Sequence, residues 1–106
     1  MASFLVQFSY TEAGVKGLLK EGGSKRREAT EQLVKSLGGK LVAYYFAFGE
    51  YDGFAIVEGV ENIDVTAAAL IVGASGAVKT KTTVLLTPEE VDRATKKSGT
   101  FRAPGQ

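Results

Sequence analysis

The sequence predicts an α+β domain with a ferredoxin-like split βαβ fold, in which two helices cover one face of a four-stranded antiparallel sheet. Three observations favour this fold class. The chain has 106 residues, the length of one domain. Segments with the two-residue period of strands and segments with helical periodicity follow each other as strand, helix, strand, strand, helix, strand. After the last strand the sequence has a strong helix-start signal, which predicts an additional C-terminal helix.

The first third of the chain supplies the first strand and the first helical segments. Residues 4–10, FLVQFSY, alternate in the manner of a strand. Thr11 can then cap a short helix over 12–20. After a Glu-Gly-Gly break, Ser24 can cap a second helical stretch over 25–37, whose apolar residues recur every four positions. Two glycines end this stretch, as helix termini favour.

The middle of the chain predicts an antiparallel hairpin with strands over 41–48 and 53–58, because the segment that joins them is short. Both faces of this hairpin are apolar: Val42, Tyr44, Phe46 and Phe48 alternate with Leu41, Ala43, Tyr45 and Ala47. An antiparallel sheet with one face in water would instead alternate apolar with polar residues. Since the helices cover only one face, we expect a second copy of the chain to cover the other.

The last third of the domain contains a helix, a strand and the C-terminal helix. Asn62 is the predicted cap of a helix over 63–75, which is apolar nearly all round, so we expect both of its sides to be covered. A strand rich in Val and Thr follows over 77–86. The sequence TPEE, which begins at Thr87, has the residues of a capping box with proline at the first helical position.

The chain is therefore divided into one domain, residues 1–97, and a disordered tail, residues 98–106. The start of the sequence has no basic leader, and no run approaches the roughly 18 apolar residues that cross a membrane. We therefore expect a cytoplasmic protein without a membrane partner.

The composition excludes several kinds of chemistry. The chain has no Cys and no His, so it lacks thiolates, disulfides and the commonest metal ligand and general base. A zinc site made only of carboxylates would be unusual. The net charge of +1 gives no general case for nucleic-acid binding. We therefore expect no metal, no cofactor and no nucleic-acid partner, and any catalysis must use Asp, Glu, Tyr, Lys or Arg.

The hairpin sequence YYFAFGEYDGFAIVE, residues 44–58, resembles the signature of the GYD domain family, with Gly49, Tyr51 and Asp52 at its Gly, Tyr and Asp positions. The flanking segments match as well, so the resemblance covers residues 4–91. Gly53 departs from the bulky apolar residue that usually follows the Asp. The resemblance implies a dimeric α+β barrel, in which two ferredoxin-like sheets pack face to face. It implies no particular reaction, since relatives in that superfamily include monooxygenases, isomerases, haem enzymes and ligand-sensing domains.

The signature and the tyrosines supply the first candidate site residues. Asp52 lies at the rim of an apolar sheet, where loss of solvent could make its carboxylate a catalytic proton acceptor; alternatively it organises the turn through backbone N–H groups. Gly49 is expected to supply a backbone angle that other residues resist. Tyr10, Tyr45 and Tyr51 are candidate ligand contacts, with packing in the core as the alternative. Because Tyr44 and Tyr45 are expected on opposite faces, at most one of the two lines a given pocket.

A basic segment supplies the second candidate site. Residues 16–27 contain five cations and one anion, and Lys16, Arg26 and Arg27 are its candidate binding residues. Positive charge beside a glycine-rich joint and a helix start suits a bound anion. The alternative is a solvated charge run, and binding of a nucleic acid by this segment is the least favoured interpretation.

Two functions remain open from the sequence. The first is a small homodimer that binds a small, partly apolar molecule between the sheet and its helices, with Asp52 and one tyrosine providing cofactor-free acid–base chemistry. The second is a non-catalytic ligand-binding or assembly module in which the hairpin is purely structural.

Overall fold

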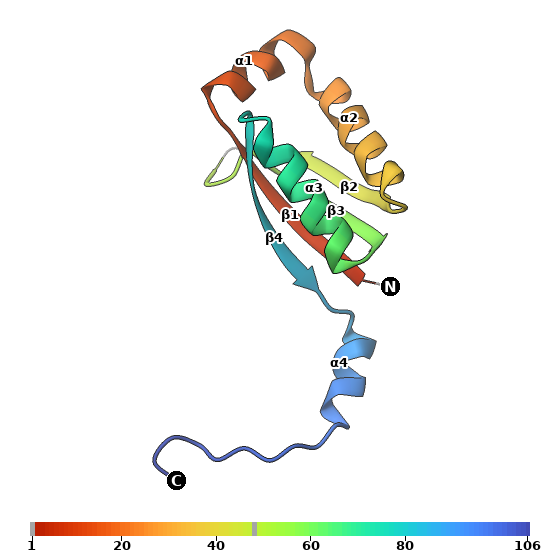
Figure 1. Cartoon of the computed structure of the whole chain (residues 1–106), viewed down its shortest axis with the longest axis vertical. Helices are drawn as coiled ribbons and strands as arrows, with labels where there is room; N and C mark the ends of the chain where they lie inside the picture. Colours follow the sequence, from red (N-terminus) through yellow and green to blue (C-terminus); the bar gives the residue numbers. More distant parts are fainter. Residues whose placement is uncertain (1, 48) are drawn as a thin grey trace.

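The computed structural model describes residues 2–47 and 49–106 and confirms the ferredoxin-like split βαβ arrangement. The strands form one antiparallel sheet in the order β2-β3-β1-β4. Helices α2 and α3 lie over the same face of this sheet (Figure 1). In chain order the elements are β1 (Ala2–Tyr10), α1 (Glu12–Glu21), α2 (Gly23–Ser36), β2 (Lys40–Phe46), β3 (Gly53–Val60), α3 (Asn62–Ala74), β4 (Val78–Leu85) and α4 (Pro88–Thr95).

Gly22 separates α1 from α2. It has a φ of 85°, a left-handed conformation that favours glycine, and its N–H donates to the Leu18 carbonyl and so ends α1. The predicted start of α2 is wrong: Gly22 and not Ser24 is the N-cap residue, and no side chain caps this helix. Because α2 begins earlier, its first residue, Gly23, lies against the ring of Phe46 on β2.

A β-bulge in β2 changes the predicted faces of the hairpin. Leu41 pairs with Val57 and Ala43 pairs with Ile56, so Val42 is an extra residue with no partner in the register. Leu41 consequently packs against the core on the same face as Tyr44, not on the opposite one. The predicted alternation is therefore wrong before the bulge and right after it, where Tyr44 and Tyr45 lie on opposite faces. Phe48 lies outside the described residues.

The core lies between the sheet and helix α2, around Phe4, Val34, Val57 and Val60. Helix α3 adds Val65 to this core with its inner side. Its outer side is exposed at Ile63, Leu70 and Ile71, so the prediction that both sides are covered is wrong for the single chain.

Reciprocal capping boxes start α3 and α4. On α3 the N-cap is Glu61, one residue before the predicted Asn62, and its N–H donates to Asp64. On α4 the predicted box is confirmed, because the Glu90 N–H donates to Thr87 Oγ1 at 3.1 Å and the Thr87 N–H donates to Glu90 Oε1 at 2.9 Å.

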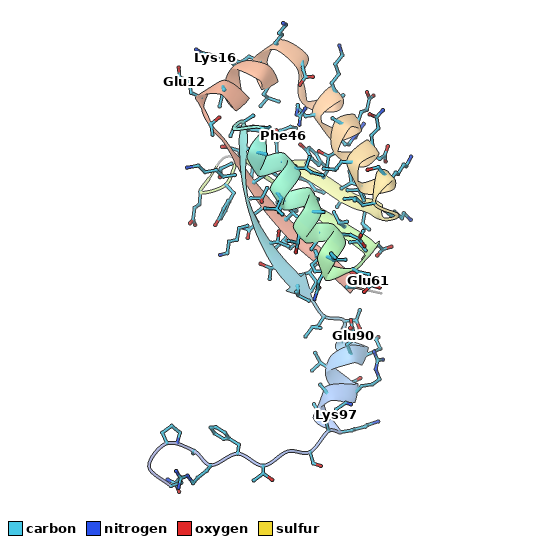
Figure 2. All side chains as sticks on the ribbon, in the orientation of Figure 1. Glu12, Lys16, Phe46, Glu61, Glu90 and Lys97 are labelled. Carbon is cyan, nitrogen blue, oxygen red and sulfur yellow. The ribbon has the colours of Figure 1, made fainter. Side chains whose placement is uncertain are left out.

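Helix α4 extends from the end of β4 away from the sheet, and residues 98–106 continue beyond it without a helix or strand (Figure 1). Figure 2 shows the side chains of Glu90 and Lys97 on this arm, well away from Phe46 in the domain. None of the helices in the described residues is long and apolar enough to cross a membrane.

Candidate functional site

A cavity of about 110 Å³ lies between the sheet, α2 and α3 and is partly open to the surface. Its floor comes from the strands and its walls from the facing sides of the two helices. Aliphatic side chains make up most of the wall. Tyr10, Arg26, Thr30, Tyr44, Asp64 and Ala68 are among the residues that line it.

One end of the cavity is aromatic and polar. Tyr10 at the end of β1 and Tyr44 on β2 both line it, and the ring of Phe8 lies between them, with ring centroids 5.7 Å and 5.3 Å away respectively. Phe46 packs edge-on against Tyr44. Because Gly23 at the start of α2 rests on Phe46, this cluster also fixes the start of α2 over the end of the sheet.

Tyr44 is a neutral phenol in this setting. Burial raises the pKa of Tyr44 above its ordinary value, and the neighbouring Tyr10 hydroxyl raises it further, while Thr30 and Arg26 oppose the shift. Tyr44 therefore keeps its hydroxyl proton at neutral pH and can donate it to an acceptor in the cavity. Thr30 donates its own hydroxyl proton to the Arg26 carbonyl at 3.0 Å, which fixes the direction of that hydroxyl.

Arg26 brings a positive charge to the same end. It lies in the first turns of α2, lines the cavity and is close enough to Tyr44 to affect its titration. Its Nη1 is 3.5 Å from Glu21 Oε2, a long and solvent-exposed ion pair. The arrangement therefore places one cation and three hydroxyl groups at one end of a mostly aliphatic cavity.

The predicted catalytic residue, Asp52, is hydrogen-bonded to the backbone of β1. Its Oδ2 accepts a hydrogen bond of 2.7 Å from the Tyr10 N–H, and its own N–H donates to the Phe8 carbonyl at 2.9 Å. These bonds fasten the Gly-Glu-Tyr-Asp segment to the last residues of β1. The carboxylate of Asp52 thereby holds the backbone of Tyr10, whose ring lines the cavity.

Replacement of Asp52 tests this role. Asp52→Asn is expected to cost less than about 1 kcal/mol, because the amide oxygen still accepts from the Tyr10 N–H. Asp52→Ala is expected to cost about 1–3 kcal/mol, because it leaves a partly buried donor without its acceptor. Urea denaturation of both variants checks the order; an alanine variant as stable as the asparagine variant would contradict it.

The sheet separates the other predicted site residues. Gly49 and Tyr51 line a shallow depression beside Gln7 and Phe54, on the side of the sheet away from the helices. Tyr45 lies on that same side, 61% exposed. Among the residues predicted from the sequence, Tyr10 and Arg26 thus line the cavity under the helices, whereas Gly49 and Tyr51 lie together on the other side of the sheet.

The basic segment is divided as well. Lys16 pairs with Glu12 across one turn of α1 at 3.3 Å, and both side chains point into solvent (Figure 2). Arg27 is exposed, whereas its neighbour Arg26 faces the cavity. The two adjacent arginines therefore lie in different environments although they belong to the same helix turn. A substitution of Arg27 is consequently a matched control for the same substitution of Arg26.

Of the residues at the polar end, Thr30 was not predicted, and the sequence left open whether Tyr44 or Tyr45 lines a cavity. The position of Tyr10 gives a signal for Tyr44. Tyr10 lies on the helix-covered face of the sheet together with Phe4 and Phe8. Of the adjacent residues Tyr44 and Tyr45, only one can lie on that face. The alternation of residues in β2 does not by itself show which of the two tyrosines lies on that face. Thr30 had no signal, since a threonine on a helix is ordinary.

The ring of Phe8 leaves no room for a side chain at residue 53, which is a glycine. A Cβ atom at residue 53 would lie 2.4 Å from Phe8 Cζ and 2.5 Å from the Tyr45 carbonyl oxygen. The Phe8 ring therefore occupies the space of a side chain at residue 53. This accounts physically for the departure of Gly53 from the bulky residue expected after Asp52.

Among the described residues there is no group of three or more acidic side chains that could hold a metal ion, and the chain has no His or Cys. The chemistry available at the cavity is therefore that of hydroxyl groups, one guanidinium, the carboxylate of Asp64 and an apolar wall.

The chain matches a known domain family and is similar to a curated protein. The model of the GYD domain matches residues 4–95. A Thermus thermophilus protein named "Glutamine synthetase and cystathionine beta-lyase binding protein" is 32% identical over 82 residues, which are 77% of this chain and 85% of the relative. No solved structure gives a significant match.

Proposed function

The chain belongs to the GYD domain family. Because its cavity joins a mostly aliphatic wall to a polar end that contains Arg26, we propose that it is a non-catalytic, homodimeric binding protein for a small, partly apolar molecule. The cavity between the sheet, α2 and α3 is the observation that carries this proposal. The hydrogen bond of Asp52 favours a binding function over acid–base catalysis, since its Oδ2 already accepts a hydrogen bond from the Tyr10 backbone N–H.

The exposed surface supports the homodimer. The single chain exposes 7775 Å², whereas a compact monomer of 11.2 kDa is expected to expose roughly 5,700 Å². The projecting arm accounts for a part of the excess. The sheet face away from the helices, here called the open face, accounts for another part; it carries Leu5, Ala43, Tyr45, Phe54 and Ile56.

A second copy of the chain fits the open face because the face is mainly apolar on its central strands, where Gln7 is uncharged, and its charges lie toward its edges. Lys79 and Lys81 lie on the outer strand β4, and Lys40 pairs with Glu58 at the end of β2. Two such faces packed together would place apolar side chains against each other and leave the charges at the rim. A specific interface of this kind buries roughly 1,600 Å².

The binding function is tested with 1-hexanol as a neutral probe and NMR of methyl-labelled protein. We expect saturable shifts of the methyl groups of cavity residues such as Val34, Val57 and Val72, because apolar cavities bind matching apolar molecules. Ala68→Leu, which fills the cavity from α3, should abolish the response. Ala74→Leu, an exposed change on the same helix, should retain it.

A second candidate function, binding of a partner protein, has its own observation. The outer side of α3 exposes Ile63, Leu70 and Ile71, and the Thermus thermophilus relative is named for binding two proteins. An exposed apolar surface on a small domain favours a protein partner. The same NMR experiment separates the two functions: a response confined to these three residues, with no change at the cavity methyl groups, would favour the partner protein and contradict the cavity proposal.

A further inference from the structure

The cation and the two phenol hydroxyls of the cavity are gathered at one end, and this asymmetry restricts what the cavity can bind. Along β1, Tyr10 lies opposite Val78, whereas Phe4 lies six residues away opposite Val57. Tyr10, Tyr44, Thr30 and Arg26 belong to the Tyr10 end. From there to the Phe4 end the wall is formed mainly by Val, Leu and Ala side chains, with Thr80 and Thr82 of β4 among them.

The charges at the two ends have opposite signs. Asp64 lines the cavity in the first turn of α3, directly after the end of β3 that pairs with the start of β1. Its Oδ2 accepts from the Glu61 N–H at 3.0 Å. A ligand with one negative group therefore has a preferred direction, with that group toward Arg26 and away from Asp64.

The guanidinium of Arg26 has more N–H donors than its hydrogen bond to Glu21 uses. An arginine side chain has five N–H donors in a fixed fork. Within the described residues its hydrogen-bond partner is Glu21, at 3.5 Å, and the two side chains are 30% and 43% exposed. Such an exposed ion pair is worth little, so an anion in the less hydrated cavity can compete with Glu21 for the guanidinium.

We propose, as a refinement that rests on the binding function above, that the cavity ligand is a small aliphatic monocarboxylate whose carboxylate is bound by Arg26 and the Tyr44 hydroxyl. A planar carboxylate matches the arginine fork and accepts from a phenol at the same time. The cavity, about 110 Å³, is of the same order as the ~150 Å³ apolar cavity that holds benzene. The enclosed tail is accordingly a chain of about six carbons.

Three probes with the same tail test the head group: hexanoate, 1-hexanol and hexylamine, each titrated at pH 7 and followed at the cavity methyl groups. We expect hexanoate to bind about tenfold more tightly than 1-hexanol, because a hydrogen bond between charged groups stabilises a complex by about this factor or more. Hexylamine is expected to bind most weakly, because its charge is repelled by Arg26 and because Asp64 at the other end already accepts from the Glu61 N–H.

Single substitutions then assign the effect to Arg26. Arg26→Gln should weaken hexanoate about tenfold and leave 1-hexanol unchanged, which also shows that the variant is folded. Arg27→Gln, the exposed neighbour, should change neither probe. Glu21→Gln should tighten hexanoate a few-fold, because it removes the competing carboxylate; a purely structural role of Arg26 would not produce this gain.

The outcomes separate this inference from the function it rests on. Equal binding of hexanoate and 1-hexanol, or a preference for hexylamine, overturns the monocarboxylate and leaves the binding function intact. Binding of hexanoate that is insensitive to both Arg26→Gln and Glu21→Gln overturns the role of Arg26. Absence of binding by all three probes overturns the binding function itself. If Arg26→Gln does not fold, the Glu21→Gln variant and the probe order in the parent protein decide.

Discussion

Tyr45→Glu is expected to convert the proposed dimer into a monomer of 11.2 kDa. Tyr45 lies on the open face, on the outer strand β2, with its ring centroid 5.6 Å from that of Phe54 on the neighbouring strand β3. In the dimer a glutamate at this position would be moved from water into an apolar interface without a partner for its charge. The cost of burying an unpaired carboxylate amounts to several kcal/mol per ion, and a two-fold interface would contain two of them.

Sedimentation equilibrium at micromolar concentration measures this change directly. The parent protein should sediment with about twice the mass of the chain and the variant with the mass of one chain. Leu19→Glu is the matched control, because Leu19 is 82% exposed on α1 and lies on a different surface; it should remain dimeric. A monomeric parent protein would exclude the dimer outright, and a dimeric Tyr45→Glu variant would show that the open face is not its interface.

Gly53→Ala is expected to destabilise the fold by about 3 kcal/mol, the upper end of what overpacking costs. The new methyl group would meet both the ring of Phe8 and the backbone of β2 at Tyr45. A flexible side chain could move aside, but the carbonyl oxygen belongs to the β2–β3 pairing and cannot retreat without loss of the strand register. The denaturation midpoint in urea should therefore fall with little change in slope.

Gly17→Ala provides the same chemical change without the obstruction. Gly17 lies in α1, and a Cβ atom there would have no neighbour within 4 Å among the atoms considered outside its own helix turn. Alanine should stabilise that helix by up to about 1 kcal/mol. The two variants are thus expected to move stability in opposite directions. A Phe8→Leu background should recover a part of the Gly53→Ala loss; full recovery would show that the contact with the Tyr45 carbonyl is harmless.

The fold could be predicted because its elements depend on local patterns. The alternation in β1, the turn residues between elements and the Thr87–Glu90 capping box all act within a few positions of the chain. The errors arose where backbone geometry overrides the pattern. The left-handed Gly22 starts α2 before Ser24, and the bulge at Val42 resets which residues of β2 face the helices.

The site could be predicted only in part, because it is assembled from distant segments. Tyr10 and Arg26 were candidates for separate sites, and no local pattern indicates that β1, β2 and α2 bring them together with Tyr44. The signature residue Asp52 contributes indirectly, through the backbone of Tyr10. Tertiary pairing of strands thus decides which of several plausible side chains share one cavity.

The bulge at Val42 has a consequence for how the length of this chain can change. A one-residue deletion in a strand ordinarily moves every later side chain to the opposite face. Val42 is the extra residue between two regular pairs, Leu41 with Val57 and Ala43 with Ile56. Its loss would restore a regular ladder and keep Tyr44 toward the cavity and Tyr45 toward the open face. β2 therefore contains one position where a codon can be lost while both surfaces of the sheet retain their residues.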